Sequence, residues 1–275
     1  MNWLLKVGLF SVGMGMSIAC SATTIQFLAT DGDKLYRADS TGAVLGSVTM
    51  NAQIQSLTTL PSGFALAGAT AGDIIACGRN PVSGRYGLYR LDNPFGAANL
   101  VQIGSLDQGV GSLTFANGQM YGVEDSINPL RVMRFNAATG NTLTNYNTGI
   151  SSAGGGGLSF NAADGQFYVT DATNNRLYRW APGGTATLVG AVGFGFSNNG
   201  IEFHEGVLYG AMRRDSPAGT MSLGYFNMSN GAFTTQATLT GIQGAGTGFL
   251  AVPEPGSLAA LGLGLLVVTR RKRKY

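Results

Sequence analysis

Short runs of alternating apolar and polar residues recur along the chain from Thr24 to Val252. In one copy of the pattern they lie at residues 158–160, 165–171, 176–180 and 186–190, with Gly, Asn and Asp residues between them. Alternation over four to eight residues is typical of half-buried strands, and those intervening residues favour tight turns. The copy therefore predicts four short strands joined by hairpins.

The same arrangement occurs in the neighbouring copies, at a nearly constant distance. Comparable segments begin at Leu113, Leu158 and Ile201, so successive copies are 45 and 43 residues apart. A period of this length with four strands per copy is the signature of a propeller blade. The chain is thus predicted to be all-β.

Two further copies are less regular. Residues 57–106 contain the third strand of a blade at 87–92, but their first half carries an insertion around 64–79. The first copy supplies only three strands, at 25–29, 34–39 and 44–48. Residues 247–251 can provide the fourth and close the ring, which would remove an exposed edge. We predict five four-stranded blades. Six blades, if the insertion hides one, and a two-sheet sandwich are the alternatives.

One copy also bears a family resemblance. Residues 165–180, with Tyr-Val-Thr-Asp and Asn-Asn-Arg-Leu-Tyr-Arg, are similar to the strand pair of NHL-type propeller repeats. This resemblance supports the blade and implies no function. The Leu-Tyr-Arg triplets at 35–37, 88–90 and 177–179 are interpreted as blade packing, with each arginine reaching outward, rather than as a ring of binding residues.

Composition supports a turn-rich β-protein and excludes one class of partner. The 275 residues include 43 glycines, and only 11% are charged. Six of the 17 basic residues lie near the termini, at Lys6 and in a cluster at 270–274, which leaves 11 basic residues against 14 acidic ones. The body is mildly acidic, so no nucleic-acid partner is predicted.

The N-terminus has the form of a secretory signal at residues 1–22. Lys6 precedes a short apolar run at 7–18, and small residues follow it. Cleavage after Ala19 or after Ala22 would satisfy the small-residue rule, and the run is too short for a membrane span. A retained anchor and a lipoprotein acylated at Cys20 are the alternatives. The lipoprotein alternative is disfavoured because Ser17 stands where a bulky aliphatic residue is expected.

The C-terminus contains three elements in order. Pro253, Glu254 and Pro255 precede a short apolar run at 258–269, and a basic stop follows, formed by Arg270, Arg271, Lys272, Arg273 and Lys274. The apolar run can insert as a short transmembrane helix if the basic residues snorkel, and they should then stay on the cytoplasmic side. A permanent single-pass anchor would have the same form.

This tail resembles the PEP-CTERM sorting signal of Gram-negative bacteria, with its motif at Pro253, Glu254 and Pro255. The resemblance implies processing by exosortase, a membrane-embedded cysteine protease, after export by the general secretion machinery and a transient stay in the inner membrane. It implies a destination at the cell surface or in the extracellular matrix, and no chemistry. The predicted organisation is a signal peptide at 1–22, a propeller-like domain at 23–251 and a sorting signal at 252–275.

Residues that could carry chemistry are few. The single histidine, His204, lies near Glu202 and Glu205, which makes a hydrolytic dyad conceivable, but a strand end in a surface turn is the preferred interpretation. Cys77 is left without a disulfide partner once the signal is removed, and its apolar neighbours indicate a buried small hydrophobe.

Two segments suggest ligand loops but lack the remaining residues. Asp31-Gly32-Asp33 resembles the start of a calcium loop, yet the later ligands do not follow, and a hairpin turn explains it better. The four glycines at 154–157 are followed by neither a lysine nor a helix, so a phosphate cradle is not supported and an inter-blade link is expected. The sequence therefore assigns no metal, cofactor or catalytic set.

These features predict an exported, non-enzymatic surface or matrix protein, with surface polysaccharide as a candidate partner. The alternative is a secreted propeller enzyme of the lactonase or glycan lyase type. It would use carboxylates at the mouth of the propeller, such as Glu124, Asp125 and Asp171.

Overall fold

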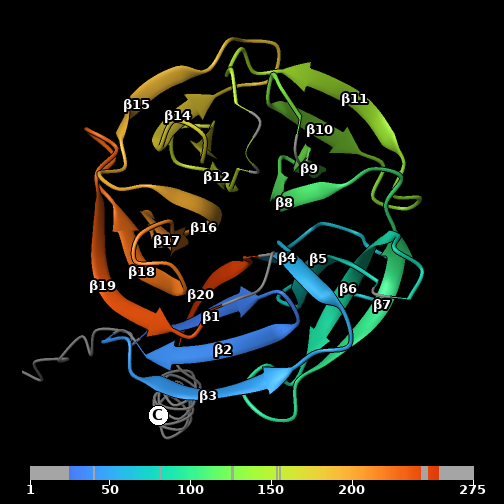
Figure 1. Ribbon diagram of the computed structural model, residues 1–275. Helices are drawn as coiled ribbons and strands as arrows, with labels where there is room; N and C mark the ends of the chain where they lie inside the picture. The colour runs from blue at the N-terminus through green and yellow to red at the C-terminus, as the bar shows by residue number, and fades with distance from the viewer. Residues whose placement is uncertain are drawn as a thin grey trace, which may run out of the picture.

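The computed structural model describes residues 25–39, 41–80, 82–124, 127–152, 154, 156–242 and 247–253. These residues form five separate four-stranded antiparallel sheets arranged in a ring (Figure 1). Blade 1 contains β20 (Phe249–Pro253), β1 (Ile25–Asp31), β2 (Lys34–Asp39) and β3 (Val44–Thr49). Blade 2 contains β4 (Gln53–Thr59), β5 (Ile74–Arg79), β6 (Tyr86–Asp92) and β7 (Asn99–Ser105).

The other three blades follow in chain order. Blade 3 contains β8 (Val110–Ala116), β9 (Gln119–Glu124), β10 (Arg131–Phe135) and β11 (Thr142–Asn147). Blade 4 contains β12 (Leu158–Asn161), β13 (Gln166–Asp171), β14 (Arg176–Trp180) and β15 (Thr187–Ala191). Blade 5 contains β16 (Phe196–His204), β17 (Val207–Arg214), β18 (Thr220–Phe226) and β19 (Phe233–Thr240). The protein is a five-bladed propeller, so the six-blade and sandwich alternatives are wrong.

Tight turns form where the sequence supplies residues that tolerate a left-handed backbone. Between β8 and β9, Asn117 and Gly118 have φ angles of 49° and 70°, as a two-residue hairpin with positive φ at both positions requires. The Asp31-Gly32-Asp33 segment connects β1 to β2 with φ 61° at Gly32, which agrees with the predicted hairpin.

The ring closes as predicted. β20 pairs with β1 in an antiparallel register that runs from Ile25 opposite Pro253 to Ala29 opposite Phe249. Phe249 and Leu250 are 0% and 1% exposed, so the closing strand also contributes two fully buried side chains to the core. The first and last described segments of the chain thus hold blade 1 together.

The insertion in blade 2 is shorter than predicted. The segment expected to be irregular, 64–79, includes β5, and the excursion is limited to residues 60–73 between β4 and β5. The sequence pattern was misleading because β5 is buried at five of its six positions and lacks polar alternation.

The hydrophobic core lies between neighbouring blades rather than within one layer. Each of five clusters joins side chains of two adjacent sheets, as when Leu28 and Leu250 of blade 1 pack with Ile54 and Tyr89 of blade 2. Cys77 is buried in the cluster between blades 2 and 3, and its thiol contacts the Val110 carbonyl oxygen at 3.5 Å. The interpretation of Cys77 as a buried small residue is confirmed.

A serine on the innermost strand links each of three successive pairs of blades. Ser56 accepts a hydrogen bond from the Leu113 N–H at 2.8 Å, and Ser112 accepts one from the Leu158 N–H at 2.9 Å. Ser159 repeats the contact with the Phe203 N–H at 2.9 Å. These hydrogen bonds fix the position of each innermost strand along the propeller axis relative to the next one.

The even number of strands per blade gives the propeller two distinct faces. Four antiparallel strands bring the chain back to the side on which the blade began, so every innermost strand begins on the same side. We call this side the linker face, because it carries the short links between blades at 50–52, 106–109 and 192–195. The opposite side, the terminal face, carries the turns after the innermost strands and the beginning of β1 and the end of β20. Both ends of the described chain therefore leave the propeller on the same face.

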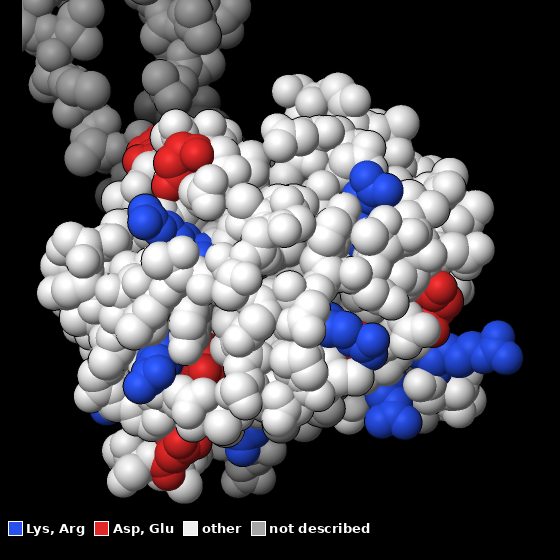
Figure 2. All heavy atoms as spheres, turned by 90° about the horizontal axis from the view of Figure 1, so that it is seen from above, with Lys and Arg blue, Asp and Glu red and all other residues white. Residues whose placement is uncertain are grey.

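Charged residues are sparse on the rim of the ring. Figure 2 shows one side of the molecule, on which separate Lys, Arg, Asp and Glu side chains stand between wide areas of uncharged residues. On this side the basic residues do not gather into a continuous patch. The described residues form no helix long and apolar enough to cross a membrane.

Candidate functional site

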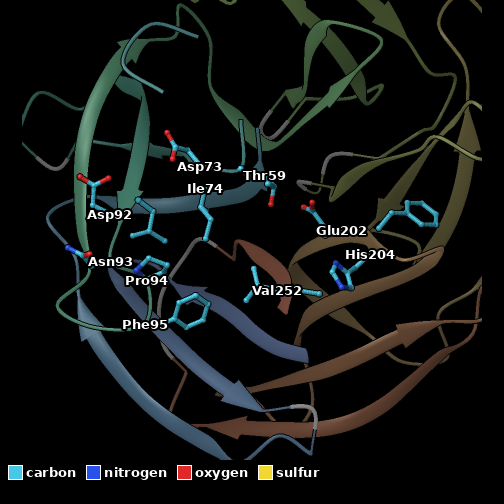
Figure 3. Close-up of a pocket in the computed structure, with 14 residues that line it drawn as sticks. Thr59, Asp73, Ile74, Asp92, Asn93, Pro94, Phe95, Glu202, His204 and Val252 are labelled. Atoms are coloured by element: carbon cyan, nitrogen blue, oxygen red, sulfur yellow. The ribbon is translucent and has the colours of Figure 1, made fainter. Parts of the chain in front are cut away.

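A pocket of about 710 Å³ opens on the terminal face between blades 1, 2 and 5. The ends of the innermost strands β4, β16 and β20 form one side of it, and the start of β5 and the loop after β6 form the other (Figure 3). Its polar lining includes Thr59, Asp73, Asp92, Asn93, Glu202 and His204, and its apolar lining includes Ile74, Leu91, Phe95 and Val252.

Glu202 is the most strongly perturbed acid in the pocket. It lies on β16, and its carboxylate accepts a hydrogen bond from the Thr59 backbone N–H of β4. The residue is partly exposed at the pocket, and the protein packed around its carboxyl group desolvates it, which raises the pKa of Glu202 well above its ordinary value. The Glu202 side chain is therefore biased toward the neutral acid, which can donate a proton or a hydrogen bond.

His204 faces the same pocket because side chains two residues apart on a strand point to the same side. It is the last residue of β16, at the predicted strand end, and Glu205 and Gly206 form the turn that follows, with φ 48° and 80°. The buried Nε2 atom of His204 has no hydrogen-bond partner among the described residues. This unsatisfied nitrogen belongs to a residue that lines the pocket.

Glu205, by contrast, is exposed on the turn and does not line the pocket. The conceivable dyad of His204 with a glutamate is therefore limited to Glu202, whose carboxyl group and the His204 ring both point into the cavity (Figure 3).

The two aspartates across the pocket already have hydrogen-bond partners within the protein. Asp73 accepts hydrogen bonds from the N–H and hydroxyl of Thr70, at 2.7 and 3.2 Å. Asp92 forms an ion pair with Arg90 at 2.6 Å, and the hydrogen bond from Arg90 lowers the pKa of Asp92. Both carboxylates therefore have fixed orientations.

Phe95 supplies an aromatic surface at the outer edge of the pocket. It lies in the loop after β6, and its carbonyl oxygen accepts a hydrogen bond from the Arg37 guanidinium of β2. That bond crosses from blade 2 to blade 1, so the two blades that flank the pocket also hold the loop that carries the ring.

Two of the three carboxylates singled out from the sequence lie on the other face. Glu124 ends β9 and forms an ion pair with Arg131 at 2.6 Å. Asp171 ends β13, is 0% exposed, and accepts hydrogen bonds from the N–H and the side-chain amide of Asn174, at 3.1 and 2.8 Å. Asp125 lies outside the described residues. The described residues contain no group of three or more histidines, cysteines or acids placed to hold a metal ion.

The other residues singled out from the sequence either have a structural role or lie outside the described residues. Gly157, in the glycine run, donates its N–H to the Thr170 hydroxyl at 2.7 Å and to the Asn199 amide oxygen at 2.9 Å, which ties the approach to β12 to blade 5. Pro253 is the last residue of β20. Glu254, Pro255, the basic stop at 270–274 and the signal at 1–22 lie outside the described residues.

Sequence reasoning missed the outer wall of the pocket. Asp73 is the last residue of the insertion, Asp92 ends a strand that was correctly predicted, and Phe95 lies in the loop after it, but no motif connects them. The available signal was the insertion itself, because an extension of one turn in a repeat array lies on one face and is a common place for a binding site.

The comparisons with known proteins bear on the tail. Residues 251–274 match the PEP-CTERM protein-sorting motif, so the chain carries that sorting signal. No curated protein is similar enough to count as a match. Among solved structures, the chain is similar to the Bacteroides ovatus xyloglucan PUL GH43B, with a TM-score of 0.45 and 12% identity over 80% of this chain and 57% of that one.

Two other solved structures show similar values. A structural genomics protein of unknown function from Bacteroides thetaiotaomicron has a TM-score of 0.41 and 9% identity, over 77% of this chain and 64% of that one. BBS1N, in complex with ARL6DN, has a TM-score of 0.37 and 12% identity, over 79% and 64%. The chain spans less than two thirds of each of these structures.

Proposed function

We propose that this chain is an exported, non-enzymatic protein that exosortase processes through its tail, and that its mature propeller associates with surface polysaccharide. One observation carries the proposal: the sorting motif at 251–274 begins within the closing strand of a complete propeller. The motif implies export through the secretion machinery and a membrane-anchored precursor. The body is then a folded cargo, and cell surface or matrix is its destination.

The pocket on the terminal face supports the association with polysaccharide. Sugars present hydroxyl groups at the edges of a ring whose faces are apolar, and such rings pack on aromatic side chains. The pocket offers the Phe95 ring together with two fixed carboxylates and the unpaired Nε2 of His204. A buried polar atom without a partner costs free energy until a ligand bonds to it, so occupation by a hydroxyl-rich ligand is favourable.

The processing half of the proposal is tested in hosts with and without exosortase. With the enzyme, mass spectrometry should find the secreted protein without residues 258–275; without it, the full-length chain should stay in the membrane fraction. Replacing Pro253, Glu254 and Pro255 together by alanine should retain the full-length chain in both hosts. A secreted form that still carries the tail in the presence of exosortase would show that the tail is a permanent anchor.

The binding half is tested with the purified body and polysaccharide from the producing cells. Phe95→Ala should weaken retention on the immobilised polymer, because it removes the apolar surface while leaving the Arg37 bond to the backbone intact. Glu202→Gln and Glu205→Gln form a matched pair, since only Glu202 lines the pocket. Equal retention of the wild type and Phe95→Ala would mean that this pocket is not the polysaccharide site.

A second candidate function is supported by Glu202 itself. A carboxyl group whose pKa is raised by burial, next to an unpaired histidine in an open pocket, has the properties of a general acid. The chain would then act as a secreted hydrolytic or lytic enzyme on glycans or lactones. Turnover of any member of a glycan and lactone panel, lost in Glu202→Gln and kept in Glu205→Gln, would establish this function in place of the non-enzymatic one.

A further inference from the structure

The closing strand leaves almost no chain between the propeller and the membrane. β20 ends at Pro253, and the apolar run of the tail begins at Leu258, so only residues 254–257 separate them. Four fully extended residues span about 14 Å. The headgroup layer on one side of a bilayer occupies about 5–7 Å of that length.

The direction of exit sets which face looks toward the membrane. Pro253 lies opposite Ile25 at the end of the β20–β1 pair, on the terminal face. Val252, one residue earlier, lines the pocket. The chain therefore leaves the propeller beside the pocket mouth, and a tail inserted in the membrane pulls that mouth toward the lipid.

Charge on this face opposes adhesion to lipid. The turns of the terminal face carry the exposed acids Asp164 and Glu205, and the pocket adds Asp73 and Asp92. Two arginines lie at the same end, Arg90, which is paired with Asp92, and the exposed Arg179 near the end of β14, so these four acids still outnumber the bases. Anionic headgroups would repel such a face, so its approach to the membrane depends on the tether alone.

We propose that the terminal face is a membrane-facing surface in the anchored precursor, and that the pocket is closed to polymeric ligands until the tail is removed. The occupant is the lipid surface on the exported side of the inner membrane. Removal of the tether abolishes the contact because the acidic face has no attraction of its own. Where the pocket binds polysaccharide, which rests on the function proposed above, processing and ligand binding are then ordered in time.

The test compares the two faces by cysteine labelling in the full-length precursor. Ala163→Cys places a thiol in an exposed turn of the terminal face, and Ser83→Cys places one in an exposed loop of the linker face. Both variants carry Cys20→Ser, because cleavage after Ala19 would leave that thiol on the exported chain, and Cys77 is buried and gives the unlabelled background. In spheroplasts of a host without exosortase, a bulky polyethylene glycol maleimide should label Ala163→Cys several-fold more slowly than Ser83→Cys.

Two controls separate the membrane from local reactivity. In a chain that ends at Pro255, the two thiols should react at similar rates, because the propeller is intact and untethered. A flexible Gly-Ser insert of about 20 residues between Pro255 and Gly256 should restore the labelling of Ala163→Cys in the anchored precursor.

Similar labelling of both faces in the anchored precursor, without any insert, would overturn the proposal. The assay requires neither exosortase nor polysaccharide, so a failure of ligand binding or of processing leaves its result intact. A precursor in the soluble fraction would overturn membrane anchoring and this proposal together, and would leave the polysaccharide site untouched.

Discussion

The two faces of the propeller use buried polar groups in opposite ways. On the linker face, Asp171 is wholly buried and bonded to the turn that follows it, and Glu124 is paired with Arg131. On the terminal face, Glu202 is desolvated with one backbone bond, and His204 has a buried nitrogen without a partner. The linker-face acids each accept a hydrogen bond from a side chain, of Arg131 or Asn174, whereas the histidine at the pocket keeps one nitrogen unbonded. The comparison places the candidate function on the face that also carries the tail.

Removing the closing strand should have the largest effect on this arrangement. A chain that ends at Gly248 loses β20, with its buried Phe249 and Leu250, and exposes the edge of β1. Deleting one buried large side chain costs about 2–5 kcal/mol, and a domain has only about 5–15 kcal/mol of stability. We expect aggregation, measured by size-exclusion chromatography and light scattering.

The matched control for that truncation is a chain that ends at Pro255. It lacks the tail but keeps all of β20, so it should stay monomeric with a cooperative thermal transition. A monomeric chain ending at Gly248 with the same Tm as this control would contradict closure by β20.

On the linker face, Asp171→Ala should cost about 1–3 kcal/mol, because it removes a buried carboxylate that accepts hydrogen bonds from the N–H and the side-chain amide of Asn174. The matched variant Asn174→Ala keeps the backbone bond and loses the side-chain bonds to Asp171 and the Ser151 carbonyl. It should therefore destabilise the protein less. Urea unfolding of the two variants measures the difference, and an Asp171→Ala variant as stable as wild type would mean that this buried acid is not structural.

The sequence predicted the ring better than the site because the ring depends on local, repeated features. Alternation, glycine turns and a constant period fixed the strands, and the missing strand of blade 1 identified β20. The serines at 56, 112 and 159 were overlooked, although each lies on an innermost strand and accepts a backbone N–H of the next blade.

The pocket depends on residues from blades that are far apart in the sequence. Thr59, Phe95, Glu202 and Val252 meet only after the ring has closed. The pattern of strand ends instead drew attention to Glu124 and Asp171, since sequence alone cannot show which acids will find a partner. Desolvation of Glu202 is likewise a property of the folded neighbours and not of its strand.

Glu202→Gln should have an intermediate effect, with a sign that depends on pH. Since the folded-state pKa of Glu202 is raised, the folded protein keeps a proton that the unfolded chain releases above its ordinary pKa of about 4.3. Wild-type stability therefore falls as the pH rises from that value to the folded-state pKa. Glutamine does not titrate and can still accept the Thr59 bond. The variant should gain of the order of 1 kcal/mol at neutral pH and nothing near pH 4.

Thermal unfolding of wild type and Glu202→Gln across that pH range checks the expectation, with Glu205→Gln as the exposed control. A Tm difference that is constant with pH would mean that the Glu202 carboxyl group is solvated, and would remove the basis for its role as a proton donor.

The smallest effect is expected for the ion pair of the linker face. Glu124 and Arg131 are 13% and 33% exposed at their side chains, so water and salt screen their attraction. Glu124→Gln should cost less than about 1 kcal/mol, and the loss should shrink further in high salt. Because the Arg131 side chain is one third exposed, its charge stays partly solvated when the carboxylate is removed. A loss as large as that of Asp171→Ala, measured by urea unfolding at two salt concentrations, would show that this pair holds the loop between β9 and β10 in place. The linker face would then depend on this ion pair as much as on the turn that Asp171 holds.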